Sequence, residues 1–89
     1  MKISSYKLTE NIYDIQPIYL PKDCKIISAD IKEDGIISLY VLNTDVELDY
    51  DLRKFKIVST DETIYNEKIH YIGTYETAFG IKHLIEVFD

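Results

Sequence analysis

The chain has 89 residues, 46% hydrophobic and 29% charged, a composition typical of a globular protein rather than a disordered segment. We expect 1–89 to form a single β domain. The formal net charge is −6, which disfavours direct binding of duplex nucleic acid, because phosphate contacts dominate that affinity. An acidic protein is better suited to a basic protein surface.

Cysteine content and apolar runs predict the compartment. Cys24 is the single cysteine, so no internal disulfide can form, and the start Met1–Tyr6 lacks the apolar run of a signal peptide. No apolar run reaches the ~18 residues that a membrane span requires. We therefore expect a protein of the reducing cytoplasm with no membrane partner.

The first half of the chain shows period-two alternation and turn residues. Tyr6–Leu8 and Asp14–Leu20 are predicted strands. Pro17 cannot donate to a ladder, so its strand should lie at an edge or be irregular there. Pro21-Lys22-Asp23 is a predicted turn.

The clearest predicted unit is a hairpin from Lys25 to Leu42. A three-residue loop, Glu33-Asp34-Gly35, separates apolar from polar faces and puts Gly35 where a left-handed residue is needed. A two-residue loop would mix the faces. The preferred register pairs the expected core residues Ile31 with Ile37, Ala29 with Leu39 and Ile27 with Val41, and on the other face Asp30 with Ser38 and Ser28 with Tyr40.

The apolar alternation changes parity in the middle of the chain. Even positions from Val46 to Leu52 are apolar, whereas Phe55 and Ile57 follow at odd positions. This change predicts a bulge, a bend or two separate segments near Arg53. A short helical turn is expected near 61–65, capped by Thr60 or Asp61.

The C-terminal part is a predicted hairpin of Lys68–Thr77 and Ile81–Phe88, joined by Ala78-Phe79-Gly80. Gly73 inside the first strand predicts a bulge or a close backbone approach. The three-residue loop pairs Glu76 with Lys82 and Tyr71 with Val87.

Six to seven short strands at turn spacing predict an all-β fold, a small antiparallel sandwich or open barrel. A small sheet with exposed edges either blunts or pairs them, which favours a homodimer.

Several segments resemble one family of small proteins: Leu20–Ala29, Leu39–Leu42, Arg53–Val58, Tyr71–Tyr75 and His83–Asp89. The family is encoded by bacteriophages and prophages and is a domain of unknown function. The resemblance covers most of the chain from Tyr6 onward; Ser59-Thr60-Asp61 replaces a Gly-Thr-Gly-like turn. It implies a phage or mobile-element origin, hence a bacterial host cytoplasm, and an all-β fold, but it supplies no activity.

Alternating carboxylates are the most distinctive charge pattern. On a strand they would face one side at intervals of roughly 6.6–6.8 Å. Such a row can occupy a basic groove of a host protein; the simpler interpretation is a solvated face. The EF-hand pattern fails, because Tyr50 replaces its glycine and Lys56 its final glutamate. The candidate partner-binding residues are Asp45, Glu47, Asp49 and Asp51.

Aromatic and basic side chains offer a second candidate site. Aromatic faces can stack on bases or nucleotides, although cross-strand packing is the simpler role. The candidate ligand-binding residues are Tyr71, Tyr75, His83, Arg53 and Lys56.

Catalytic and metal chemistry have little support. Cys24, His70 and His83 share no ligand-like spacing, so we expect no cofactor, no metal and no enzyme activity. The leading hypothesis is a phage accessory protein that binds and modulates a host protein, of the counter-defence type. The alternatives are a small-ligand or nucleotide-signal binder and a structural or oligomeric role.

Overall fold

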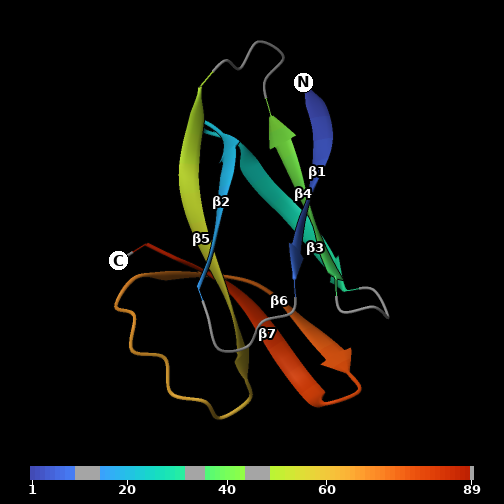
Figure 1. Cartoon of the computed structure of the whole chain (residues 1–89), viewed down its shortest axis with the longest axis vertical. Helices are drawn as coiled ribbons and strands as arrows, with labels where there is room; N and C mark the ends of the chain where they lie inside the picture. The colour runs from blue at the N-terminus through green and yellow to red at the C-terminus, as the bar shows by residue number, and fades with distance from the viewer. Residues whose placement is uncertain (10–14, 32–35, 44–48, 89) are drawn as a thin grey trace.

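The computed structural model describes residues 1–9, 15–31, 36–43 and 49–88 as seven strands in two antiparallel sheets (Figure 1). The predicted all-β sandwich is confirmed, as two open sheets. The described part of the chain contains no helix long and apolar enough to cross a membrane. The three-stranded sheet has the order β1 (Lys2–Thr9), β4 (Ile36–Asn43), β3 (Lys25–Ile31), and the four-stranded sheet β2 (Gln16–Pro21), β5 (Tyr50–Ser59), β7 (Gly80–Val87), β6 (Ile69–Thr77).

The core lies between the two sheets. Alternate side chains of each sheet face inward, so both sheets contribute to one apolar layer. Burying each large side chain contributes about 1.5–3 kcal/mol. The buried residues of this layer are Leu8, Ile37, Leu39 and Val41 from one sheet, Leu20, Phe55, Ile57 and Leu84 from the other, and Cys24 beside them.

The first hairpin confirms most of the predicted register. Ile31, Ala29, Asp30 and Ser28 pair with Ile37, Leu39, Ser38 and Tyr40 as expected. The loop 32–35, with Gly35, and the side chain of Ile31 lie outside what the structure describes.

The prediction for Ile27 is wrong. A bulge between Ile26 and Ser28 pairs Ile26 with Val41, and Ile27 is 48% exposed. One extra residue in a strand turns every side chain beyond it to the opposite face of the sheet. Ile26 therefore packs against the core where Ile27 was expected to. Ala29 is partly buried there.

The proline and turn residues of the sequence correctly predicted an edge strand and the turn that follows it. β2 is an edge strand, as Pro17 requires, and Cys24 N donates to Pro21 O at 3.2 Å to close the predicted turn. β1, β3 and β6 are the other edges. A homodimer through one of them stays a prediction.

β5 does not break where the alternation changes parity. Its pairing with β2 and β7 runs from Tyr50 to Ser59 without a register shift, so the predicted bulge or second segment near Arg53 is wrong. The pattern changes because Tyr50 and Leu52 remain exposed on the outer face, while Arg53 takes an inner position.

The second hairpin has a shorter loop than predicted. Thr77 pairs with Gly80, so Glu76 meets Ile81 rather than Lys82. The two-residue loop forms because Gly80 adopts φ +107° and its carbonyl accepts a hydrogen bond from Thr77 Oγ1 at 2.8 Å.

The bulge at Gly73 is confirmed. The register shifts between Tyr71 and Gly73, and this shift together with the shorter loop pairs Tyr71 with Ile85 and not with Val87. A Cβ at Gly73 would lie 2.7 Å from the Tyr75 hydroxyl, because the ring of Tyr75 covers this backbone.

The helical turn predicted near 61–65 is wrong. Glu62 N donates to Ser59 O at 3.1 Å, with Asp61 at φ 69°, and this single turn leads into an extended segment. Ile64 packs on the outer face of the four-stranded sheet, against Val58, Ile85 and Val87. The apolar cluster there, rather than a helix, holds the segment.

Candidate functional site

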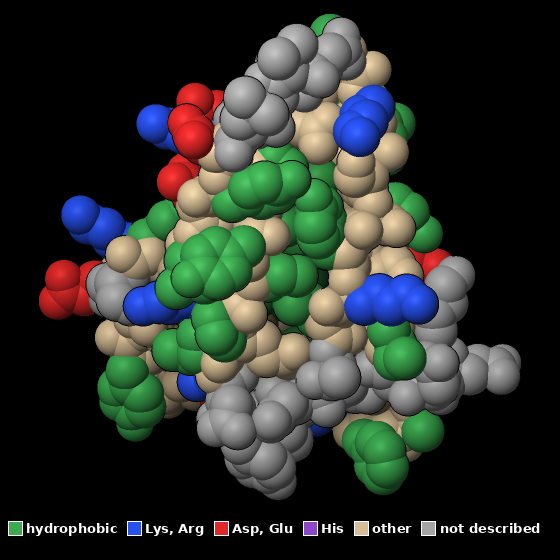
Figure 2. Space-filling view, turned by 45° about the horizontal axis from the view of Figure 1, so that its top comes forward, with side chains coloured by type: hydrophobic (Ala, Val, Ile, Leu, Met, Phe, Trp, Pro, Cys, Tyr) green, Lys and Arg blue, Asp and Glu red, His purple; other side chains and the backbone are tan. Residues whose placement is uncertain are grey.

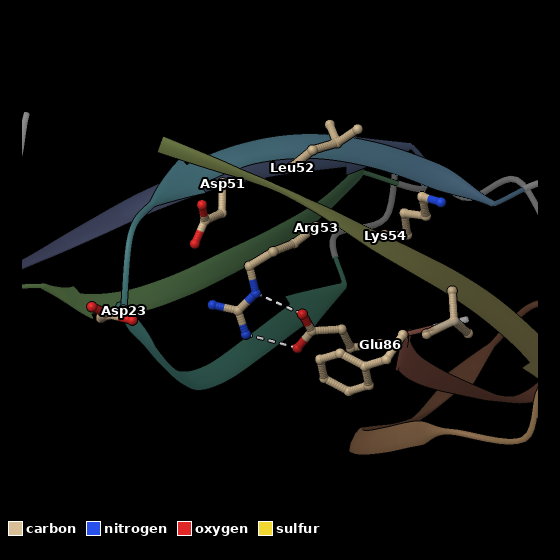
Figure 3. Close-up of a pocket in the computed structure, with 8 residues that line it drawn as sticks. Asp23, Asp51, Leu52, Arg53, Lys54 and Glu86 are labelled. Carbon is tan, nitrogen blue, oxygen red and sulfur yellow. Dashed lines mark hydrogen bonds and ion pairs between the residues drawn. The ribbon is translucent and has the colours of Figure 1, made fainter. Parts of the chain in front are cut away.

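A buried ion pair joins β5 to β7 beside the core. Glu86 is paired with Phe55 in the ladder, and Arg53 lies two residues before Phe55, so both side chains share the inner face. Arg53 donates from Nε to Glu86 Oε2 at 2.6 Å and from Nη2 to Oε1 at 2.7 Å (Figure 3). Glu86 is 1% exposed, so its charge depends on this two-bond contact.

The guanidinium also contacts the turn after β2. Arg53 Nη1 donates to Cys24 O at 3.1 Å and to Cys24 Sγ at 3.3 Å. Hydrogen bonding to Glu86 raises the pKa of Arg53 above its ordinary value, although burial opposes the shift. One cation therefore ties together β5, β7 and the segment between β2 and β3.

Cys24 and His70 lie at this ion pair. Burial raises the pKa of the Cys24 thiol above its ordinary value of 9.0, although Arg53 lowers it. The thiol is thus protonated at neutral pH and packs as an apolar group. His70 Nδ1 lies 4.0 Å from Glu86 Oε1 on an exposed side chain. Among the described residues no three His, Cys, Asp or Glu side chains form a metal-binding group.

A pocket of about 540 Å³ opens beside the ion pair. Asp51 and Asp23 face it from β5 and from the turn, whereas Leu52 and Lys54 lie on the other side of the β5 ribbon (Figure 3). All three guanidinium nitrogens already donate, two to Glu86 and one to Cys24, which assigns Arg53 to holding the fold at this pocket.

A second hollow lies on the outer face of the four-stranded sheet; we call it the outer groove. It has a volume of about 270 Å³. It is lined by the end of β5, the segment that follows β5, and strands β6 and β7. Its lining residues are Val58, Ser59, Thr60, Asp61, Glu62, Ile64, Ile69, Tyr71, His83 and Ile85.

A chain of hydrogen bonds crosses the outer groove. His83 Nε2 lies 2.9 Å from Thr60 Oγ1, and His83 Nδ1 lies 3.0 Å from Thr74 Oγ1. Thr74 Oγ1 also shares a hydrogen bond with the Tyr71 hydroxyl. The rings of Tyr71 and His83 are 6.2 Å apart and tilted by 47°. The histidine is thereby held in one orientation beside an exposed aromatic ring.

A third feature, which we call the β2–β5 surface, is a cluster of exposed apolar side chains on the outer face of the four-stranded sheet. Tyr19 pairs with Leu52 across the ladder, and Tyr50 lies next along β5; their exposed fractions are 64%, 48% and 55%. On the face shown in Figure 2, hydrophobic side chains gather at the centre, with most visible acidic side chains to one side. Asp49 and Asp51 are exposed next to Tyr50 in the sequence, but Asp51 faces the pocket, on the opposite side of the β5 ribbon from Leu52 (Figure 3).

The structure separates the predicted ligand residues into two groups. Tyr71 and His83 line the outer groove, and Lys56 lies beside it, 3.9 Å from Glu62. Arg53 and Tyr75 are on the inner face, where Tyr75 packs against the core. Of the predicted acidic row, Asp49 and Asp51 are exposed, and Asp45 and Glu47 lie outside the described residues.

Sequence reasoning missed the roles of Glu86, Thr60 and Thr74. A usable signal existed for Glu86, since it is one acid within the apolar run from Leu84 to Phe88. An acid at a buried strand position requires a cation, but the alternation does not say which one. The two threonines carry no comparable signal.

The family of the chain is established by its amino-acid sequence. The chain belongs to the family DUF7352, described as a domain of unknown function, over residues 1–88. No curated protein and no solved structure matches it.

Proposed function

We propose that the protein works by binding another protein through the β2–β5 surface. The observation that carries this is the exposed cluster of Tyr19, Tyr50 and Leu52. Aromatic side chains supply large contact area at low entropy cost and are enriched in interface centres, where a polar rim surrounds them. Lys54, which is exposed, lies on the same side of β5 as Leu52 (Figure 3).

The partner we propose is a basic protein. The net charge of −6 attracts a basic surface and speeds its encounter. Asp49 and Asp51 are exposed and flank Tyr50 in the sequence, and with Asp45 and Glu47 they form the acidic row proposed for this contact.

The proposed setting is a bacterial host. The resemblance to bacteriophage and prophage proteins supports a phage accessory protein in the host cytoplasm. There it would inhibit or modulate a host protein, as counter-defence proteins do.

The test of this proposal is capture of host proteins from lysate with two pairs of variants. Tyr19→Ser with Leu52→Ser should abolish capture of the specific partner, and reversal of all four acids to Lys should weaken it strongly. The apolar control is Phe79→Ser with Ile81→Ser, also exposed but in the β6–β7 hairpin. The charge control reverses Asp30, Asp61, Glu67 and Glu76.

The outcome is read from the difference between each variant and its control. Equal capture by the β2–β5 variants and the wild type would show that the partner binds elsewhere. Equal loss in the two charge variants would show that net charge alone attracts the partner, and would remove the acidic row from the interface.

A second candidate function is binding of a small ligand or nucleotide signal in the outer groove. It is favoured by the meeting of Tyr71 and His83 over an apolar floor. Thermal denaturation with cyclic and linear nucleotides and nucleosides tests it, since a ligand at 100 times its Kd adds about 2.7 kcal/mol of stability. No change in melting temperature with any of them would exclude this function.

A further inference from the structure

The size of the outer groove limits what it can hold. Its volume of about 270 Å³ is below the ~300–1,000 Å³ of pockets that take drug-sized ligands. It is also open along its length to solvent on the outer face of the sheet. These dimensions suit a compact ligand of one or two rings.

The floor and one wall suit a flat apolar surface. Val58 and Ile85 are 3% and 1% exposed beneath the groove, and Ile64 packs against both. Tyr71 stands beside them with 53% of its surface exposed. A planar ring placed on this floor would bury the exposed aromatic face, and base–aromatic stacking of this kind is a favourable and sequence-tolerant contact.

The charged groups of the groove are acidic. Asp61 and Glu62 line it, and no Lys or Arg is among its described lining residues. Lys56 pairs with Glu62 Oε2 at 3.9 Å, and Lys82 Nζ donates to Ser59 Oγ at 2.8 Å, so both of these cations next to the groove are already engaged. A phosphate group at this position would meet carboxylates with no cation free to pair with it.

The hydrogen-bonding groups of the rim are mainly acceptors. Both ring nitrogens of His83 already have threonine hydroxyl partners. The Thr60 hydroxyl is bonded to His83, and Glu62 Oε1 accepts a hydrogen bond from Ser59 N at 3.1 Å, so the exposed acceptors that remain are the carboxylate of Asp61 and Glu62 Oε2 beside Lys56. A ligand that complements them must bring N–H donors of its own.

From these four properties we infer that the outer groove binds a planar heteroaromatic ring that carries amino groups and no negative charge. Nucleobases and nucleosides of the aminopurine type fit this description, whereas nucleotides do not. The inference rests on the second proposed function and narrows it to one ligand class.

The experiment uses adenine, adenosine and AMP as probes, with unsubstituted purine as the ring that lacks the amino group. Isothermal titration calorimetry on the full chain gives each Kd. Adenine and adenosine should both bind. AMP should bind at least about fivefold more weakly than adenosine, because its phosphate meets the carboxylates. Purine should bind at least about fivefold more weakly than adenine, because it lacks one hydrogen bond.

Variants place the site in the groove. Tyr71→Ala should weaken adenosine binding by about tenfold, because the stacking surface is lost. Tyr65→Ala is the matched control, since Tyr65 is 87% exposed and does not line the groove. The double variant Asp61→Asn with Glu62→Gln should bring the Kd of AMP closer to the Kd of adenosine.

Two failures are distinguishable. If AMP binds as tightly as adenosine in the wild type, the ligand class is wrong and small-ligand binding still stands. If none of the four probes binds, both the ligand class and the proposal of small-ligand binding in the outer groove are wrong. Equal binding by Tyr71→Ala and Tyr65→Ala would place the ligand outside the groove.

Discussion

The four-stranded sheet carries one polar cluster on each face, and the two differ in exposure and in their hydrogen bonds. On the inner face, Arg53 and Glu86 are paired by two short bonds and closed by Cys24. On the outer face, Tyr71, Thr74, His83 and Thr60 form a chain that remains open to solvent. A cluster whose donors are engaged within the protein stabilises the fold, whereas an open one can still take a partner.

The largest effect should come from breaking the inner cluster. Glu86→Ala leaves the Arg53 charge half-buried without its carboxylate, so we expect a loss of about 3–5 kcal/mol in the free energy of unfolding. Urea denaturation followed by circular dichroism measures it.

The paired substitution is the control for this loss. Replacing both Arg53 and Glu86 by Leu should recover most of the stability, because an apolar pair of similar volume needs no charge partner. If the double variant is as unstable as Glu86→Ala, the ion pair is not what the single variant lost.

The next effect concerns the close approach on β6. Gly73→Ala should cost about 1–3 kcal/mol, because the new Cβ meets the Tyr75 hydroxyl. Tyr75→Phe removes that oxygen, so the same Ala substitution should cost less in the Tyr75→Phe background. A double-mutant cycle from denaturation curves measures the coupling, and independent effects would contradict this contact.

Breaking the outer cluster should have a smaller effect. His83→Ala removes hydrogen bonds to Thr60 and Thr74 that solvent can replace, so we expect a loss below about 1.5 kcal/mol. The same denaturation measurement applies. A loss equal to that of Glu86→Ala would remove the distinction between the two faces.

The smallest change in stability at neutral pH is expected from one thiol and two tyrosine hydroxyls. Burial raises the pKa values of Cys24, Tyr6 and Tyr75, so the folded state holds these protons more tightly than the unfolded state does. Their contribution to stability is complete below the ordinary thiol value of 9.0 and falls as pH rises through the raised values. The urea concentration at the unfolding midpoint, measured between pH 7 and 11, should fall only in the alkaline part of this range. The fall should be smaller in the double variant Cys24→Ser with Tyr75→Phe than in the wild type.

The local alternation of apolar and polar residues predicted the strands, but it did not predict for every residue which face of the sheet its side chain lies on. Asp30, Ala29 and their partners were placed correctly near the first turn, and the register failed only past the bulge at Ile27. A bulge inserts one residue without a distinctive composition, so alternation alone cannot locate it. Gly73 shows the exception, because glycine inside a strand marks such a place.

The candidate site was less predictable than the fold. Tyr71 and His83 are close in sequence on one hairpin, and their meeting follows from strand pairing. Arg53 and Glu86 lie 33 residues apart, and their contact depends on the order of β5 and β7 in the sheet. Sheet order is a long-range property that period-two patterns do not contain.

The bulge on β3 bears on how chain length can vary in this family. Ile26 pairs with Val41 and Ser28 with Tyr40, so Ile27 is the one residue without an opposite partner. A chain from which Ile27 is deleted would keep every other cross-strand pair of this hairpin. Insertions and deletions of a single residue are therefore expected at this position, inside a strand rather than in a loop.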